Sequence, residues 1–573
     1  MIITEILARN SRVYKDEVAL IERSPADHIR REITWHEFYT SSNRFAKALL
    51  DVGIKKGDKV VQLMTNCLEW LPIYFGILST GALAVPLNFR FESDKILLCT
   101  EVAEAKVFIF GEEFIERLFS IRTILESTVH TWVFAGDPKH CPSYAVPYHI
   151  FIQSDSETNN FDSNMTKFFE SERTQSELRI VEEGLILDSK QRGTEASLYS
   201  NSLFNHVEIS IEDDAALYFT SGTTGTPKAV LLTHRNLEHA CYVENNHHGQ
   251  KHDDVFLCIP PLYHTGAKMH WMGSFIVGGK SVILKGVKPE WILEAVSEEK
   301  ATIVWLLVPW AHDILIAIES NKVALADYDL DQWRLLHIGA QPVPPSLIRE
   351  WKEYFPHHEY DTNYGLTEST GPGCVHLGVE NSHKIGAIGL PGFDWECRIV
   401  DGSGNGLPPG ESGELLVRGP GVMKEYYKNP EATRKTIING WLYTGDIARY
   451  DKDGFIWLVD RKKDVIICGG ENIFPVEIEH FFMQHPKIQD IAVIGVPDER
   501  LGEIPAGIIS AKPGMTLTKA EITEFGYGLS RYKRLRKIIF ADVPRNATGK
   551  IEKPKLRRLY AKDNRIEVDK LLK

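Results

Sequence analysis

Helical and extended residue patterns alternate along most of the chain, and this alternation constrains the fold more than any other feature. Apolar residues recur every three or four positions from Trp35 to Val52, and Gly53 ends that pattern. The expected elements are helices at 35–52 and 70–80 and strands at 59–64, 82–87, 216–219, 255–259, 281–284, 302–308 and 335–338. Such alternation predicts an α/β fold whose parallel or mixed sheets are layered with helices.

The C-terminal part of the chain differs from the rest in composition. Glycine and proline turns multiply from Gly386 to Gly421, which indicates a β-rich subdomain. From Arg461 onward there are 22 Lys and Arg against 15 Asp and Glu, whereas residues 1–460 have a net charge of −20. A helical pattern at 476–483 and a strand pattern at 488–495 indicate a small α+β domain. We therefore predict a large N-terminal domain, 1–460, and a small C-terminal domain, 461–573.

Residues 152–210 interrupt the alternation with clusters of Ser, Asp, Glu, Asn and Gln. Long polar segments of this kind usually lie on the surface as loops. We interpret the segment as a surface excursion of the large domain, and the alternative is an arm that binds a partner.

Charge, cysteine spacing and apolar content exclude several classes of protein. The net charge of −13 argues against a general nucleic-acid binder. The 8 cysteines form no CxxC pair, as is typical of a reducing compartment. The N-terminus lacks the basic and apolar regions of a signal peptide, and the longest apolar stretch, 73–87, is shorter than a transmembrane segment of ~20 residues. These observations predict a cytoplasmic protein without a transmembrane segment.

One segment carries the side chains that a polyphosphate requires. From Thr220 to Lys228 the chain reads Thr-Ser-Gly-Thr-Thr-Gly-Thr-Pro-Lys. Glycines let backbone N–H groups approach an anion, hydroxyls donate hydrogen bonds, and lysine adds charge. The segment is not a Walker loop, because the glycine spacing differs and Ala229 follows the lysine. Taken alone, it is also compatible with an ordinary Ser/Thr turn.

This segment resembles the phosphate loop of the adenylate-forming superfamily, which includes acyl-CoA synthetases, adenylation domains of peptide synthetases and firefly luciferases. The other motifs of that superfamily follow in order: Pro-Leu-Tyr-His at 261–264, Tyr-Gly-Leu-Thr-Glu at 364–368, Tyr-Thr-Gly-Asp at 443–446, Asp-Arg-Lys-Lys-Asp at 460–464 with Gly-Gly-Glu-Asn at 469–472, and Asn-Ala-Thr-Gly-Lys at 546–550. The resemblance spans about residues 34–555. One departure is Ala229, where family members usually carry glycine; we expect ordinary backbone there.

The resemblance implies a role for each motif, although each charged residue taken singly would be interpreted as a solvated surface charge. The β- and γ-phosphates would be held by Thr220, Ser221, Gly222, Thr223, Thr224, Gly225 and Lys228. Mg²⁺ would be held by Glu368 and Thr223. Asp446 and Arg461 would bind the ribose, and adenine would be bracketed by Gly339, Ala340, Gln341, Asn363 and Tyr364. The expected catalytic residues are Lys550, Thr367, Glu368 and His264.

A second half-reaction with CoA is implied as well. In the superfamily the C-terminal domain is mobile and rotates about a hinge, here Lys463, so that one site serves both half-reactions. Rotation would replace Lys550 by the Gly469-Gly470 loop, whose missing side chains leave room for a pantetheine arm. The basic run 531–537 is a candidate for the CoA phosphates, and a solvated basic surface is an equal alternative.

The identity of the acid is less constrained. Acetate-specific relatives fill their pocket with a tryptophan where this chain has Gly365, so acetate alone is not expected. The expected pocket neighbours are Tyr263, His264, Trp271, Trp310, Gly339 and Gly365. The two tryptophans favour a bulky apolar acid, unless both belong to the core. We expect Lys268 and His270 to face solvent; the alternative is a substrate with a polar or second acidic group.

Together the motifs predict an AMP-forming acid–thiol ligase. It would join a medium-chain, alicyclic or aromatic carboxylate to CoA through an acyl-adenylate, in a reaction that can run in either direction. The expected ligands are ATP, Mg²⁺ and CoA, with no nucleic-acid partner, and the expected state is a monomer or homodimer. The alternatives are an adenylating enzyme that loads a carrier protein, a luciferase-like oxygenase, and a non-catalytic sensor of acyl-adenylate or CoA.

Overall fold

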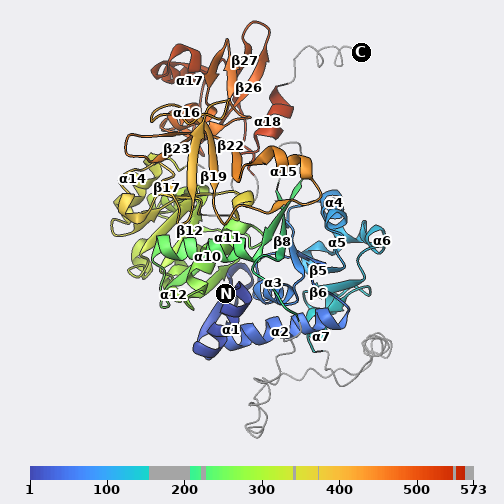
Figure 1. Cartoon of the computed structure of the whole chain (residues 1–573). Helices are drawn as coiled ribbons and strands as arrows, with labels where there is room; N and C mark the ends of the chain where they lie inside the picture. The colour runs from blue at the N-terminus through green and yellow to red at the C-terminus, as the bar shows by residue number, and fades with distance from the viewer. Residues whose placement is uncertain (154–206, 221–226, 340–342, 372, 546–549, 562–573) are drawn as a thin grey trace, which may run out of the picture.

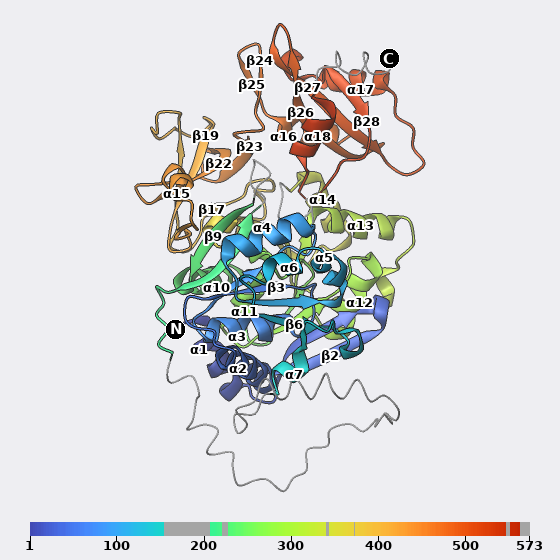
Figure 2. The ribbon, with the colours of Figure 1, turned by 90° about the vertical axis from the view of Figure 1, so that its right-hand side faces the viewer.

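The computed structural model describes residues 1–153, 207–220, 227–339, 343–371, 373–545 and 550–561. In both ribbon views the segment from about residue 465 onward, coloured orange to red, lies at one end of the molecule (Figures 1 and 2). The larger blue-to-green body lies at the other end. Most of the polar excursion expected at 152–210 lies outside the described residues.

Two large sheets form the body, and most of their strands are parallel. The first has the order β14-β13-β12-β10-β11-β1-β2, in which only β1 and β2 pair antiparallel. Its strands are β1 (Val18–Ser24), β2 (Ile29–Thr34), β10 (Val255–Cys258), β11 (Lys280–Leu284), β12 (Ile303–Leu307), β13 (Leu335–Gly339) and β14 (Glu359–Asp361). The sequence analysis predicted no strand before residue 59, so it missed the hairpin of β1 and β2.

The second sheet has the order β20-β9-β8-β4-β3-β5-β6-β7, and antiparallel pairing is confined to β20, β9 and β8. Its strands are β3 (Lys59–Leu63), β4 (Leu83–Pro86), β5 (Val107–Gly111), β6 (Thr131–Ala135), β7 (Val146–Pro147), β8 (Asp214–Thr220), β9 (Lys228–Thr233) and β20 (Glu425–Tyr426). The mixed sheets layered with helices confirm the predicted α/β class.

The longer helices of the body are α1 (Ile3–Val13), α2 (Trp35–Asp51), α3 (Trp70–Ser79), α4 (Ser93–Ala103), α10 (His234–His248), α11 (Thr265–Phe275), α12 (Pro289–Glu299), α13 (Val308–Glu319) and α14 (Pro345–Tyr354). Shorter ones are α5 (Ile115–Phe119), α6 (Arg122–Leu125), α7 (Tyr148–Phe151) and α15 (Pro430–Thr436). Every residue of α11 is buried, so this helix lies inside the core rather than on its surface. None of the helices in the described part of the chain combines the length and apolarity needed to cross a membrane.

Local sequence explains why α2 begins and ends where it does. The Thr34 side chain accepts a hydrogen bond from the backbone N–H of Glu37, whose carboxylate accepts from the N–H of Thr34. This reciprocal pair is a capping box. Gly53, with φ of +85°, follows the last turn. The predicted helix at 35–52 is therefore confirmed within one residue at its end.

The C-terminal half adds three smaller sheets. Strands β15 (Asn363–Tyr364), β16 (Val375–His376) and β17 (Leu390–Pro391) form the first. The β-rich subdomain contains β18 (Glu396–Val400), β19 (Gly413–Arg418), β21 (Ile437–Ile438), β22 (Trp441–Tyr450) and β23 (Ile456–Arg461). The last sheet contains β24 (Ile466–Cys468), β25 (Glu471–Ile473), β26 (Ile488–Asp498), β27 (Gly502–Ala511) and β28 (Lys537–Phe540), with helices α16 (Pro475–Phe482), α17 (Lys519–Phe525) and α18 (Lys553–Tyr560).

Candidate active site

A hairpin carries the Ser/Thr- and Gly-rich loop. Strands β8 and β9 are antiparallel, and Thr220 lies opposite Lys228 at the end of the hairpin that carries the loop. The loop residues Ser221, Gly222, Thr223, Thr224 and Gly225 lie outside the described residues. Ala229 is an ordinary residue of β9 and does not have a positive φ. The expectation of ordinary backbone at this departure from the family pattern is therefore confirmed.

Tyr426 connects the lysine of this hairpin with Glu368. The Nζ atom of Lys228 lies 4.5 Å from the centre of the Tyr426 ring. The Tyr426 hydroxyl donates a hydrogen bond of 2.7 Å to Glu368 Oε1. Burial and the adjacent Glu368 carboxylate raise the pKa of Tyr426, so this hydroxyl remains a donor. An ammonium group and a carboxylate thus both contact Tyr426, and metal-bound phosphates require groups of these two kinds.

A second carboxylate lies where the β-rich subdomain joins the body. The Tyr364 hydroxyl donates a hydrogen bond of 2.5 Å to Asp446 Oδ2. Arg461 Nε lies 3.3 Å from Asp446 Oδ1, because Asp446 and Arg461 are opposite each other on β22 and β23. Asp446 is 6% exposed. An ionised carboxylate in this position can accept hydrogen bonds from two ribose hydroxyls.

Lys550 belongs to the C-terminal segment, but it interacts electrostatically with residues of the body. Burial and the positive charge of Arg461 lower its pKa to about 8, and the carboxylates of Asp446 and Glu368 partly oppose that shift. The pKa of His264 is lowered to about 3, first by burial and then by Lys550. His264 is therefore a neutral imidazole, and its Nδ1 accepts a hydrogen bond from the N–H of Gly266 at the start of α11. The structure thus brings together Lys550, Asp446, Glu368, Arg461 and His264.

The remaining predicted nucleotide and CoA residues occupy several places. Thr367 precedes Glu368 in a 3₁₀ turn, and Gly339 ends β13. Ala340 and Gln341 lie outside the described residues. Lys463 is exposed in the turn between β23 and β24. Gly469 and Gly470 form an exposed turn between β24 and β25 with φ of +61° and +88°, a conformation that L side chains rarely adopt.

The predicted acyl-pocket residues are more scattered. Tyr263 is nearly buried and packs edge-on against Phe89. Trp271 is buried in the core, where its ring lies 5.5 Å from that of Phe275. Trp310 is partly buried at the start of α13, and Gly365 follows Tyr364.

The expectation that Lys268 and His270 face solvent was wrong. Lys268 is 0% exposed and His270 is 2% exposed, because α11 is buried on every side. Lys268 Nζ lies 4.4 Å from the ring centre of Tyr218 and 5.1 Å from that of Tyr74. It also donates a hydrogen bond of 3.3 Å to the carbonyl of Leu262.

The sequence analysis missed Trp305 and Tyr426. Trp305 lies between two glycines: a Cβ added to Gly339 would come within 4.0 Å of its Nε1, and one added to Gly266 within 3.1 Å of its ring. Its Nε1–H is buried without a hydrogen-bond partner. The strand at 302–308 had only been identified as apolar, and separating its two faces by their alternation would have singled out Trp305. No sequence signal distinguished Tyr426.

Two family patterns match the chain. The pattern described as AMP-binding enzyme matches residues 7–427, and that described as AMP-binding enzyme C-terminal domain matches residues 477–550. Together they include every described site residue above except Asp446, Arg461, Lys463, Gly469 and Gly470.

Similar proteins include both plant and bacterial ligases. The chain is 36% identical over 365 residues to 4-coumarate–CoA ligase-like 9 of Arabidopsis thaliana. This match covers 62% of this chain and 64% of that protein. It is 29% identical over 541 residues to the long-chain-fatty-acid–CoA ligase FadD13 of Mycobacterium tuberculosis, covering 94% of each. Among solved structures, the anthranilate CoA ligase AuaEII in complex with anthranoyl-AMP superposes with a TM-score of 0.81 at 26% identity, over 98% of this chain and 97% of that chain.

Proposed function

Because the chain belongs to the family of AMP-binding enzymes, we propose that it is an AMP-forming acyl-CoA ligase. It activates a carboxylic acid with ATP to form an acyl-adenylate, and it then transfers the acyl group to CoA. Its ligands are ATP, Mg²⁺, CoA and a small carboxylic acid.

The environment of Lys550 carries this proposal. This lysine of the C-terminal segment interacts electrostatically with Asp446, Glu368 and Arg461, which we propose as nucleotide-binding residues. ATP and a carboxylate are both anions, so their reaction requires a cation placed between them. A solvated surface lysine would not have its pKa lowered to about 8.

In the first half-reaction, a carboxylate oxygen of the acid attacks the α-phosphorus of ATP, and the bond to pyrophosphate breaks. Lys550 neutralises charge between the two reactants, and Asp446 binds the ribose beside Arg461. Lys228 and the loop Ser221–Gly225 hold the leaving pyrophosphate, and Thr367 contacts the α-phosphate. Glu368 and Thr223 would hold Mg²⁺, which would supply further charge neutralisation.

In the second half-reaction, the CoA thiol attacks the acyl carbon and AMP leaves. We propose that residues 1–460 and 461–573 are separate domains and that Lys463 is the hinge between them. Rotation at Lys463 would move Lys550 away and bring Gly469 and Gly470 toward the acyl-adenylate. The exposed, glycine-only conformation of that turn supports this role, since no side chain blocks its approach.

We propose a medium-chain, alicyclic or aromatic acid as substrate. The names of the similar proteins include a hydroxycinnamate, a long-chain fatty acid and an aminobenzoate. The Trp305 ring lies between Gly339 and Gly266, next to the cap residue His264, and this aromatic ring beside the predicted pocket supports the proposal. We further propose that the enzyme is cytoplasmic and acts as a monomer or homodimer. Its eight cysteines are free, as is typical of proteins in a reducing compartment.

The test is a panel of carboxylic acids incubated with ATP, Mg²⁺ and CoA, with AMP release and acyl-CoA formation measured together. We expect both products in equal amounts with at least one acid of the proposed classes. Lys550→Ala is the control variant and should release AMP at least ~100-fold more slowly. ATP–pyrophosphate exchange with an acid but without formation of acyl-CoA would favour loading of a carrier protein instead. No AMP with any acid would refute the proposal.

A further inference from the structure

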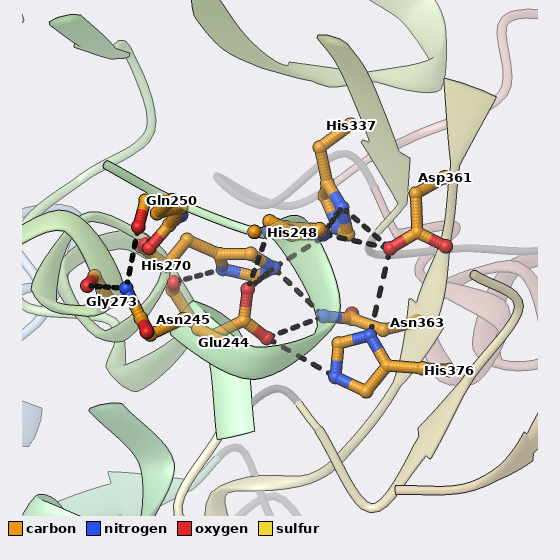
Figure 3. Close-up of polar contacts among 12 residues, drawn as sticks. Glu244, Asn245, His248, Gln250, His270, Gly273, His337, Asp361, Asn363 and His376 are labelled. Carbon is orange, nitrogen blue, oxygen red and sulfur yellow. Dashed lines mark hydrogen bonds and ion pairs between the residues drawn. The ribbon is translucent and has the colours of Figure 1, made fainter. Parts of the chain in front are cut away.

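A buried cluster of ionisable side chains lies next to the nucleotide site but is not part of it. Figure 3 shows its members: Glu244 and His248 on α10, His337 on β13, Asp361 on β14 and His376 on β16. All five side chains are 0% exposed. None of them has a role in the ligase reaction proposed above. Two carboxylates and three imidazoles at zero exposure require an explanation, because buried charge is costly.

Three of these side chains present their donor atoms to one point. His248 Nε2 lies 2.7 Å from Asp361 Oδ2 and 3.2 Å from His337 Nδ1. His337 Nδ1 lies 3.7 Å from Asp361 Oδ2. Donor atoms bound at ~2.1 Å to one tetrahedral Zn²⁺ are about 3.4 Å apart, so these separations bracket the value for a shared metal ion.

His376 lies beside this group of three donors. Its Nδ1 lies 3.5 Å from the same oxygen of Asp361, and its Nε2 lies 3.4 Å from Glu244 Oε1. Both nitrogens are buried without a hydrogen bond of good geometry. Glu244 Oε2 and His248 Nδ1 are likewise buried without one. Of these atoms, His376 Nδ1 is the one that faces Asp361 Oδ2, and this unsatisfied buried nitrogen is an observation independent of the donor spacing.

Each donor residue also has a polar contact on the side that faces away from the centre of the cluster. Glu244 lies beside the remote nitrogen of His248, at 3.2 Å, and beside that of His376. The remote nitrogen of His337 lies 3.0 Å from His270 Nε2. Asp361 Oδ1 accepts a hydrogen bond of 2.8 Å from the N–H of Gly378, which leaves Oδ2 for the centre. Metal-binding histidines are typically oriented by such outer contacts.

Charge balance favours a divalent cation. The two buried carboxylates bring two negative charges, which require positive charge close by. One divalent ion with three neutral imidazoles would balance both carboxylates.

We propose that this cluster binds one Zn²⁺ ion through His248, His337 and Asp361, with Glu244 orienting His248 and His376 lying beside the site. Imidazole ligands favour Zn²⁺ and related transition metals over Mg²⁺, which prefers oxygen. Because protein-bound Zn²⁺ is usually four-coordinate, a water molecule would complete the coordination. The ion joins the C-terminal end of α10 to two strands of one sheet, just before Asn363 and Tyr364 enter the nucleotide site. Because the ligands are fully buried, the ion enters as the chain folds.

The first experiment measures metal in the full-length protein, expressed with an affinity tag that contains no histidine. We expect about one equivalent of Zn²⁺ per chain, retained during EDTA treatment of the native protein and lost only on unfolding. Refolding with Zn²⁺ should give a melting temperature at least ~5 °C higher than refolding with Mg²⁺ alone. Binding of Co²⁺ in place of Zn²⁺ should give the visible bands of a four-coordinate ion.

Variants locate the ion. Asp361→Asn and His337→Gln should retain less than ~0.2 equivalents of zinc, because each loses a ligand. His252→Gln is the matched control: this exposed imidazole pairs with Glu17 outside the cluster and should leave the zinc content unchanged. If a ligand variant does not fold, the Co²⁺ spectrum of the wild-type protein still decides the coordination. Less than ~0.1 equivalents of zinc both as purified and after refolding with Zn²⁺ would overturn the proposal, and so would equal content in Asp361→Asn and the control. None of these measurements depends on ligase activity.

Discussion

At the scale of single residues, the lowered pKa of Lys550 has a direct kinetic consequence. The free enzyme needs the protonated ammonium, and Lys550 loses its proton as the pH rises through about 8. We expect kcat/KM for ATP, measured by ATP–pyrophosphate exchange, to fall about tenfold per pH unit above that value. Lys550→Arg should be slower at neutral pH but lack this fall, because arginine stays protonated. A wild-type profile that is flat to about pH 10 would contradict the assignment.

Tyr426 provides the second prediction at this scale. Its hydroxyl donates to Glu368, while its ring lies under Lys228. Tyr426→Phe keeps the ring and removes only the hydrogen bond to a charged acceptor, which is worth about 1.5–3 kcal/mol. We expect the KM for MgATP to rise about tenfold or more in the exchange assay. The neighbouring Tyr427→Phe is the control, and similar KM values for both variants would show that the hydroxyl of Tyr426 does not act on Glu368.

Lys268 gives a prediction about stability. Burial lowers the pKa of Lys268 well below its ordinary value of about 10.4, so the unfolded chain binds more protons than the folded one between those two values. Stability of the wild-type protein therefore rises with pH across that window. Lys268→Met should remove this slope and stabilise the protein by about 1–2 kcal/mol at pH 7, as measured by urea unfolding.

The same variant tests the open question about the substrate. If Lys268 only fills the core, Lys268→Met should leave the preference between mono- and dicarboxylates unchanged. A specific loss of activity with dicarboxylates would instead show that Lys268 binds a second acidic group.

At the scale of elements, β9 shows how a departure from the family pattern is accommodated. Ala229 pairs with Phe219 in extended backbone, so alanine carries no conformational strain there. Restoring the family's glycine with Ala229→Gly should destabilise the protein by about 0.5–1 kcal/mol, because glycine loses more conformational entropy in a strand. Urea unfolding measures the effect. A stabilised variant, or one with markedly faster pyrophosphate exchange, would show that the position needs glycine.

Sequence patterns identified elements better than they identified the faces of those elements. The helix at 35–52 and the strand at 59–64 were located within about one residue, because caps and short apolar runs are local signals. The burial of α11 could not be predicted in the same way, since Lys268 and His270 interrupt its apolar surface and only the packing of two sheets around it explains their burial. The His248–Asp361 contact joins residues far apart in the chain, and no local pattern encodes it.

At the scale of the whole molecule, the proposed rotation of the C-terminal domain separates the two half-reactions. Lys463→Pro would restrict the backbone at the exposed turn between β23 and β24. We expect this variant to retain ATP–pyrophosphate exchange and to lose at least ~10-fold in acyl-CoA formation from preformed acyl-adenylate. Lys463→Ala keeps the backbone free and serves as the control. Equal losses in both half-reactions for the proline variant would argue against a hinge at this position.

The pairing of Asp446 with Arg461 across β22 and β23 has a mechanical meaning for such a motion. The proposed ribose ligand and the last strand residue before the hinge are hydrogen-bonded neighbours in one sheet. A rotation axis through Lys463 would therefore pass close to the proposed ribose site. A large rotation of the C-terminal domain about this axis would move the ribose-binding residues very little. The acyl-adenylate could therefore stay bound through its nucleotide while the rotation replaces Lys550 by Gly469 and Gly470. With the proposed hinge, this geometry would protect a hydrolysable mixed anhydride from release between the two steps.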